Sequence, residues 1–178
     1  QHADEFKKEV QLLSNLRHRN IVRYIGASLQ APDLCVLTEL AECSLSDLLY
    51  KNNTKLRNDQ FLSLAKDIAK GVKYLHSLRP MIIHRDLKSS NLLIDERMVC
   101  KISDFGLSRI KSESASNISG MLGTPGWSAP EIYKQEKYTE KVDMYSYGVV
   151  LGELVTGEKP YAGLNQMQIA FATVYQGQ

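Results

Sequence analysis

The chain has 178 residues, 43% of them hydrophobic and 24% charged, which is typical of one globular domain or a large part of one. Its 22 basic and 20 acidic residues leave a net charge of +2, so the charge gives no reason to expect binding to nucleic acid. No apolar run reaches the ~18 residues of a membrane-spanning helix, and three cysteines without metal-ligand spacing favour a reducing, cytoplasmic location.

The predicted elements begin with a helix over residues 2–16, in which apolar residues recur at helical spacing. Two strand-like segments follow at residues 22–29 and 34–40, and a short helix at residues 45–50. A long amphipathic helix is predicted over residues 59–78. Its expected apolar face consists of Leu62, Ala65, Ala69, Val72 and Leu75.

The later elements begin with two short apolar segments at residues 91–94 and 98–102, which are separated by a turn. Residues 108–120 are rich in serine and lack periodicity, which indicates a loop. The most apolar helix is predicted over residues 141–156 and is expected to be buried. A weaker helix is predicted over residues 164–175.

Three motifs follow one another along the chain. Residues 84–91 read HRDLKSSN, residues 104–106 read DFG and residues 129–131 read APE. The five fixed letters of the first motif match by chance only about once in 10⁶–10⁷ positions. Together the motifs resemble the catalytic domain of eukaryotic protein kinases, whose catalytic loop has the form HRDLxxxN. HRDLKSSN, DFGLSR and GTPGWSAPE look most like the tyrosine-kinase-like group, whose members mostly modify serine and threonine.

The resemblance covers essentially the whole chain and implies the α+β, bilobal kinase fold. Residues 1–40 match part of the N-terminal lobe, with helix C, two strands and the start of the hinge. Residues 41–178 match the C-terminal lobe through about helix G. The first glycine is Gly26, so the glycine-rich loop that precedes helix C in the family is not in this sequence, and neither is its strand lysine. We therefore expect a truncated domain that lacks this loop and the last helices and is inactive alone.

The catalytic loop and the DFG motif supply the groups for phosphoryl transfer in the family, a reaction that depends mainly on positioning and charge neutralisation. The resemblance implies that Asp86 is the catalytic base for the incoming hydroxyl, and that Asn91 and Asp104 hold the Mg²⁺ ions that bridge the phosphates of ATP. Lys88 is expected to contact the transferred phosphate, as in kinases that act on serine and threonine. Thr124 occupies the position that bonds the catalytic aspartate and lysine in such kinases.

The resemblance also implies which residues bind ATP. Glu9 matches the helix-C glutamate that pairs with the ATP-binding lysine, and Thr38 matches the gatekeeper behind the adenine pocket. The hinge, whose backbone bonds adenine, begins at Glu39 and includes Ala41. Leu93 is expected to pack beneath the adenine ring. ATP and Mg²⁺ are therefore the expected cofactors.

Further positions match regulatory and structural residues of the family. Arg85 precedes the catalytic aspartate, as in kinases that are switched on when phosphorylation orders the loop after DFG. The serines of that loop are Ser112, Ser114, Ser116 and Ser119, of which Ser116 and Ser119 are the favoured sites. The positions that match structural residues are His84, Phe105, Gly106, Glu131 and Asp143. Asp143 matches the buried helix-F aspartate that anchors the catalytic loop, and Glu131 matches the partner of an arginine from a late helix.

Two other functions fit parts of the pattern. A pseudokinase that acts as a scaffold or binding module typically lacks the HRD aspartate, the DFG aspartate or the strand lysine, and both aspartates are present here as Asp86 and Asp104. Transfer to a small molecule is disfavoured by the complete APE segment, which serves peptide docking in the family. The resemblance therefore implies a serine/threonine kinase with a protein substrate and an upstream activating kinase as partners.

Overall fold

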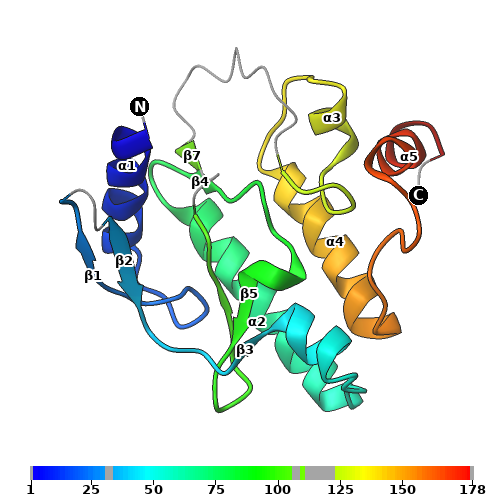
Figure 1. The fold of residues 1–178 in the computed structure, drawn as a ribbon, viewed down its shortest axis with the longest axis horizontal. Coiled ribbons are helices and arrows are strands. Elements are labelled where there is room, and N and C mark those ends of the chain that lie inside the picture. The colour runs from blue at the N-terminus through cyan, green and yellow to red at the C-terminus, as the bar shows by residue number, and fades with distance from the viewer. Residues whose placement is uncertain (1, 31–33, 106–108, 111–122, 177–178) are drawn as a thin grey trace.

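The computed structural model describes residues 2–30, 34–105, 109–110 and 123–176. A small N-terminal part contains one helix and a β-hairpin, and a larger part is built mainly from helices (Figure 1). This mixture of helices and strands agrees with the predicted α+β class. Among the helices of these residues, none is long and apolar enough to cross a membrane.

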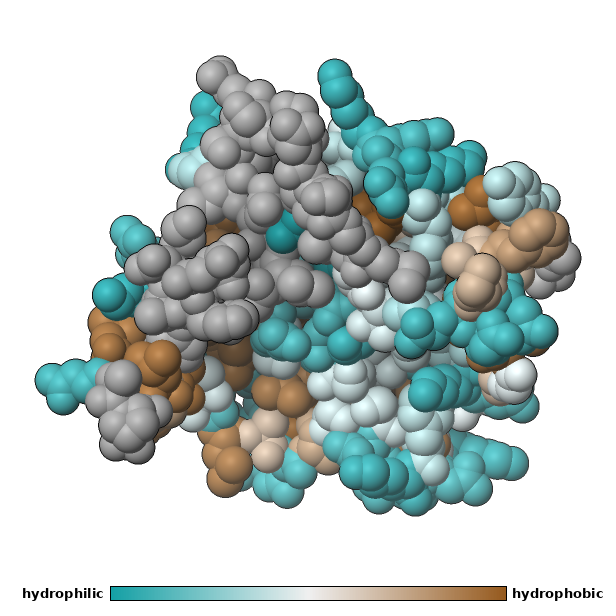
Figure 2. Space-filling view, turned by 45° about the horizontal axis from the view of Figure 1, so that its top comes forward, coloured by the Kyte–Doolittle hydropathy of each residue, from teal (hydrophilic) through white to brown (hydrophobic). Residues whose placement is uncertain are grey.

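The N-terminal part consists of α1 (His2–Asn15) and the strands β1 (Tyr24–Ser28) and β2 (Cys35–Thr38). The two strands pair antiparallel, with Tyr24 opposite Thr38. Large apolar side chains of this hairpin are exposed, and Figure 2 shows an apolar surface at the left, where the hairpin lies. These exposed side chains are Ile25, Leu29, Leu34 and Leu37.

Two small sheets lie in the larger part of the molecule. In one, β5 (Leu92–Ile94) lies between β3 (Cys43–Ser44) and β6 (Cys100–Ile102), and both pairings are antiparallel. In the other, β4 (Ile82–Ile83) pairs antiparallel with β7 (Arg109–Ile110). Both sheets border the HRDLKSSN segment, because β4 precedes it and β5 follows it in the sequence.

The long helices of the larger part are α2 (Asn58–Ser77) and α4 (Lys141–Thr156), which contact each other (Figure 1). The bounds of α4 agree with its prediction. The helix ends at Gly157, whose φ of 70° is the left-handed conformation that glycine adopts easily. The shorter helical segments are η1 (Asp47–Lys51), η2 (Ser89–Asn91), α3 (Pro130–Tyr133), α5 (Gln166–Phe171) and η3 (Ala172–Gln176).

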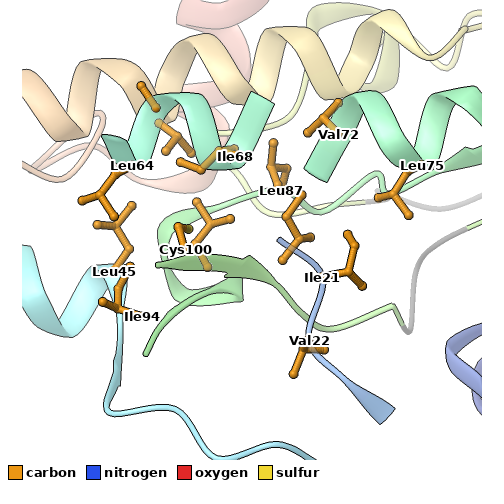
Figure 3. Close-up of a cluster of buried hydrophobic side chains, with 14 of the residues drawn as sticks. Ile21, Val22, Leu45, Leu64, Ile68, Val72, Leu75, Leu87, Ile94 and Cys100 are labelled. Atoms are coloured by element: carbon orange, nitrogen blue, oxygen red, sulfur yellow. The ribbon is translucent and has the colours of Figure 1, made fainter. Parts of the chain in front are cut away.

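The main hydrophobic core lies between α2 and the sheet of β3, β5 and β6 (Figure 3). The segment after α1 is attached to this core by the backbone, because the Val22 amide donates to the Ile102 carbonyl at 2.9 Å. Gly71 of α2 allows the close approach, since a Cβ there would lie 2.8 Å from the carbonyl oxygen of Asn20. The core therefore joins the N-terminal part to the strand that leads to the DFG motif.

Three predictions about the elements were wrong. Leu62 of α2 is 50% exposed, whereas Leu64, which was not predicted to be in the core, is buried. Helix α4 is not covered on all sides, since Val155 is 71% exposed. Arg109 and Ile110, which were predicted to lie in a loop, form β7, because β4 offers them a pairing partner.

Candidate active site

Asp143 of α4 is fully buried and binds the backbone of the HRDLKSSN segment. Its two carboxylate oxygens accept the backbone amides of His84 at 2.9 Å and Arg85 at 2.8 Å, and Nε2 of His76 lies 2.8 Å from Oδ2. Arg85 has a φ of 68°, which a residue other than glycine adopts rarely, so these bonds hold a strained conformation. The structure thus places the Asp143 carboxylate against the backbone of residues 84 and 85.

Asp86, Lys88 and Thr124 are brought together although Thr124 is far from the others in sequence. Oγ1 of Thr124 donates to Oδ1 of Asp86 at 2.7 Å, and Nζ of Lys88 lies 2.8 Å from Oδ2. The same Nζ donates to Oγ1 of Thr124 at 2.7 Å. A carboxylate, a cation and a hydroxyl therefore form one closed group at the start of the loop. This group could take a proton from a hydroxyl and balance negative charge on the group that the hydroxyl attacks.

Asn91 lies beside this group and is buried. Its amide nitrogen donates to the backbone carbonyl of Asp86 at 2.9 Å and to Oδ2 of the same residue at 3.1 Å. The Asn91 carbonyl accepts the backbone amide and the hydroxyl of Ser103, both at 2.9 Å, which fixes the residue before Asp104. The loop and the DFG motif are therefore linked through Asn91.

The amide oxygen of Asn91 and the exposed carboxylate of Asp104 are the kind of hard oxygen donors that suit Mg²⁺. Mg²⁺ usually takes only one or two protein ligands and completes its shell with water and phosphate oxygens. In the described part of the chain, no group of three or more acidic, histidine or cysteine side chains forms a metal site of its own. The donors present fit a metal that arrives with a phosphate ligand, and the Mg²⁺ assignment stays a prediction.

His84 and Phe105, which were predicted to be structural residues, pack against each other. Both side chains are buried, and their rings meet edge to face with centroids 5.2 Å apart. Nε2 of His84 lies 2.9 Å from the carbonyl oxygen of Ser103, which can only accept, so Nε2 carries the proton. Nδ1 then accepts the Asp86 amide at 3.3 Å. His84 thus connects the catalytic-loop motif with the residues next to DFG.

The residues predicted to bind adenine lie at the end of β2, along the connection between β2 and β3, and in β5. Thr38 ends β2, and the amide of Glu42 donates to the carbonyl of Ile94 at 2.9 Å, which places the connection beside β5. Leu93 of β5 is half-buried there. Ala41 lies next to Glu42 in this connection and is also half-buried. The arrangement brings these residues to one region, and their role toward ATP stays a prediction.

Glu39 has a further contact that the sequence did not reveal. Its carboxylate accepts the backbone amide of Arg23 at 2.7 Å and pairs with Nζ of Lys101 at 2.9 Å. Burial alone would raise the pKa of Glu39, but the hydrogen bonds from Lys101 and the Arg23 amide outweigh it and hold the pKa below its usual value. The pair joins the β2–β3 connection to β6.

We expect Glu39→Gln to lower the stability of the folded domain at pH 7 by about 1–2 kcal/mol, because a charge-assisted bond to Lys101 is lost. A carboxyl whose pKa is lowered on folding stabilises the fold above its unfolded pKa and loses this effect as the pH falls through the folded pKa. The gap between wild type and variant should therefore close below about pH 4. Thermal unfolding from pH 3 to 8 measures it, with Lys101→Met as the matched partner; a gap that does not narrow as the pH falls from 5 to 3 would contradict the pair.

Some of the predicted site residues lie partly or wholly outside the residues that the structure describes. Gly106 and the four loop serines Ser112, Ser114, Ser116 and Ser119 lie outside the described residues. Glu9 lies in α1, but its side chain is also outside the described part.

Glu131 is half-buried in the first turn of α3. Nη1 of Arg85 donates to the hydroxyl of Tyr138 at 3.0 Å, a partner that no local sequence pattern indicates.

An α+β domain with HRD, DFG and APE motifs, in which a buried loop aspartate is bonded to a lysine and a threonine, belongs to the class of protein kinase catalytic domains. A family model described as protein tyrosine and serine/threonine kinase matches residues 1–178, and the chain belongs to this family. The predicted protein kinase resemblance is thereby confirmed.

Curated relatives with this similarity are named serine/threonine kinases. The chain is 45% identical over 174 residues to "Probable serine/threonine-protein kinase SIS8" of Arabidopsis thaliana, covering 97% of this chain and 17% of the relative. It is 44% identical over 177 residues to "Serine/threonine-protein kinase CTR1" of the same plant, covering 98% and 22%. It is 42% identical over 174 residues to "Probable serine/threonine-protein kinase drkA" of Dictyostelium discoideum, covering 97% and 27%. The chain thus spans about a quarter or less of the length of these relatives.

Proposed function

We propose that the protein is a serine/threonine-protein kinase that transfers the γ-phosphate of ATP to serine and threonine hydroxyls of a protein substrate. The observation that carries the proposal is the closed group of Asp86, Lys88 and Thr124. The names of the relatives support the same activity.

In the proposed reaction, Asp86 accepts the proton of the substrate hydroxyl as its oxygen bonds to the γ-phosphorus. The bond from the γ-phosphorus to the β–γ bridging oxygen breaks, and ADP leaves with that electron pair. Lys88 lies 2.8 Å from the base and can contact the transferred phosphate, where its positive charge balances the developing negative charge. Thr124 fixes the base by its bond to Oδ1.

Asn91 and Asp104 would hold the Mg²⁺ that neutralises the charge of the ATP phosphates. Thr38, the backbone of the segment from Glu39 to Ala41, and Leu93 would form the adenine site. Arg85 would receive a phosphate added to one of the loop serines by an upstream kinase, and its bond to Tyr138 would then be in competition with that phosphate. We propose a cytoplasmic location on the cysteine content alone.

The test is phosphoamino-acid analysis of the full-length protein after incubation with labelled ATP and Mg²⁺. Lys88 and Thr124 predict label on phosphoserine and phosphothreonine. Predominant phosphotyrosine would contradict the proposed specificity. A folded protein that binds ATP and carries no label would favour a pseudokinase that acts as a scaffold.

A further inference from the structure

The helical segment formed by α5 and η3, residues 166–176, has apolar side chains on two faces. One face packs on the domain and buries Ile169, Ala172 and Thr173. A helix at the surface of a globular protein normally carries polar side chains on the face that points away from the core. In this segment the outer face is apolar as well, and its large side chains are exposed.

Four exposed side chains form a stripe along the outer face. Met167, Phe171 and Tyr175 follow one another at intervals of four residues, which places them on one side of a helix, and Leu164 precedes them by three residues. The exposed fractions are 83% for Met167, 56% for Phe171, 75% for Tyr175 and 42% for Leu164. The ring centroids of Phe171 and Tyr175 lie 5.0 Å apart. We call these four residues the α5 stripe, and Figure 2 shows apolar surface at the right of the molecule, where α5 lies.

The stripe belongs to a segment that is fixed to the domain. At the start of α5, Oδ1 of Asn165 accepts the Gln168 amide at 3.0 Å, and Oε1 of Gln168 accepts the Asn165 amide at 2.9 Å. These reciprocal bonds form a capping box. On the inner face, the Thr173 hydroxyl donates to the Tyr161 hydroxyl at 3.3 Å. The stripe is therefore held in place before a partner binds, which lowers the entropic cost of binding.

The composition of this region is that of a protein interface. Residues 160–178 contain no Asp, Glu, Lys, Arg or His, although 24% of the chain is charged. The central parts of protein interfaces are depleted in charged residues and enriched in methionine and aromatic residues. Met167, Phe171 and Tyr175 are of these types, and all three are exposed. The stripe therefore has the chemistry of a surface that binds another protein.

The absence of charge favours a second copy of the same chain as the partner. Across a two-fold axis a surface meets an identical surface, so a charge near the axis would face its own copy. An uncharged stripe avoids this conflict, and it needs no complementary charge on the partner.

The size of the stripe fits a weak dimer. At about 200 Å² for a fully exposed large side chain, the four exposed fractions amount to roughly 500 Å². A standard interface buries about 800 Å² on each partner. The stripe supplies more than half of this area, and the asparagine and glutamine side chains of the same segment can form a polar rim around it.

We propose that the α5 stripe is a dimerisation surface, on which a second copy of this protein docks through the same stripe with the two helices antiparallel about a two-fold axis at Phe171. Phe171 lies midway between Met167 and Tyr175 in the sequence. The arrangement therefore places Phe171 against its own copy and Met167 against the partner's Tyr175, a thioether–aromatic contact that is favourable. The proposal does not depend on the proposed kinase function, because association is measured without phosphate transfer.

Sedimentation of the full-length protein at a series of concentrations measures the dissociation constant of the dimer. A small apolar interface predicts a dimer that dissociates on dilution, with a Kd of ~1–100 µM. Met167→Glu should raise the Kd at least ~10-fold, because it places a charge against the partner's ring. Met167 is largely exposed, so this change disturbs no core contact. Val155→Glu is the matched control, since it puts the same charge on another exposed apolar residue, in α4, and it should leave the Kd unchanged.

Opposite charges at Phe171 test the two-fold arrangement. Phe171→Glu and Phe171→Lys should each be monomeric alone, because like charges then meet at the axis. An equimolar mixture of the two variants should associate again, since opposite charges face each other in the mixed dimer. This rescue also shows that both variants are folded. A single variant that associates with the wild-type Kd overturns the proposal, and so does a mixture that associates no more than its components.

A crosslink identifies the contact even if other parts of the full-length protein associate. Phe171→Cys should form an intermolecular disulfide under mild oxidation, because two thiols at a two-fold axis lie within disulfide reach. Val155→Cys should form no more intermolecular disulfide than the wild type. The absence of the crosslink in Phe171→Cys overturns the proposal.

Oxidation of Met167 to its sulfoxide distinguishes a second copy from another segment of the same chain as the cover of the stripe. In the wild type, Met167 should be oxidised more slowly above the Kd than below it, because the dimer shields its sulfur. A wild type that stays monomeric at ~100 µM overturns the proposal. If Met167 in that monomer also resists oxidation, another segment of the same chain covers the stripe.

Discussion

Replacing Asp86 with alanine is expected to lower kcat of the full-length protein by ~10²–10⁴-fold, the range for loss of a general base. Asp86 is the one carboxylate that is bonded to both Lys88 and Thr124 in the candidate site. Without it, the substrate hydroxyl loses the group placed to take its proton, and Lys88 loses one of the two partners that fix its position. ADP release in the presence of a protein substrate measures the effect.

Two further variants make this prediction specific. Asp86→Asn keeps the size and most hydrogen bonds of the side chain but cannot act as a base at neutral pH, so its kcat should fall nearly as far as that of Asp86→Ala. Asp59→Ala is the matched control, because Asp59 is exposed at the start of α2 and pairs with Arg57 at the surface. An Asp86→Ala protein that retains most of the wild-type kcat would refute the assignment of the base.

Replacing Asp143 with alanine is expected to give the largest loss of stability, ~3–5 kcal/mol, the cost of removing one partner from a buried polar pair. Asp143 is fully buried and accepts the backbone amides of His84 and Arg85. In the variant, these two buried amides lose the carboxylate oxygens that accept them, and the positive φ of Arg85 is no longer held by those bonds. The catalytic loop should therefore open locally as well as unfold more easily.

Hydrogen exchange measures this opening at the loop itself. In Asp143→Ala, the amides of residues 84–86 should exchange at least ~10²-fold faster, since each ~1.4 kcal/mol corresponds to a factor of ten. Asp143→Asn should have an intermediate effect, because one amide oxygen can still accept one of the two backbone bonds. Asp59→Ala should leave the exchange of these amides unchanged. Wild-type exchange in Asp143→Ala would show that the buried carboxylate does not hold the loop.

The sequence predicted best the features that are encoded locally. Helix α4 was predicted with its observed bounds, Lys141–Thr156, because residues 141–156 are the most apolar of the helical segments. The group of Asp86, Lys88 and Thr124 was predicted from motifs whose spacing carries the resemblance to a family. In both cases the signal lay within short segments of sequence, one for α4 and two separate motifs, HRDLKSSN and GTPGWSAPE, for the group.

Features that depend on distant partners were missed. Leu62 and Leu64 are both apolar, and only the sheet that packs on α2 decides which of them is buried. β7 is two residues long and exists because β4 lies beside it. Local patterns cannot indicate such pairings, because the residues that form them are brought together only by folding.

Two glutamates with unpredicted contacts show the same limit. Glu39 pairs with Lys101, which is 62 residues away in sequence. Glu153 meets Trp127, Ser89 and Tyr50, which are 26, 64 and 103 residues away. A glutamate inside an apolar stretch such as the one around Glu153 is the only sequence signal for such a network, and it does not name the partners. The structure was needed to identify them.

The central claim is that this chain contains the active site of a protein kinase. Transfer of labelled phosphate tests this claim most directly. The full-length protein is incubated with ATP labelled at the γ-phosphate, Mg²⁺ and a generic protein substrate, and the label in the substrate is measured with and without a chelator of Mg²⁺. We predict label on serine and threonine that is lost when the chelator removes the metal. A folded protein that binds ATP and Mg²⁺ but transfers no label to the substrate or to itself would contradict the account.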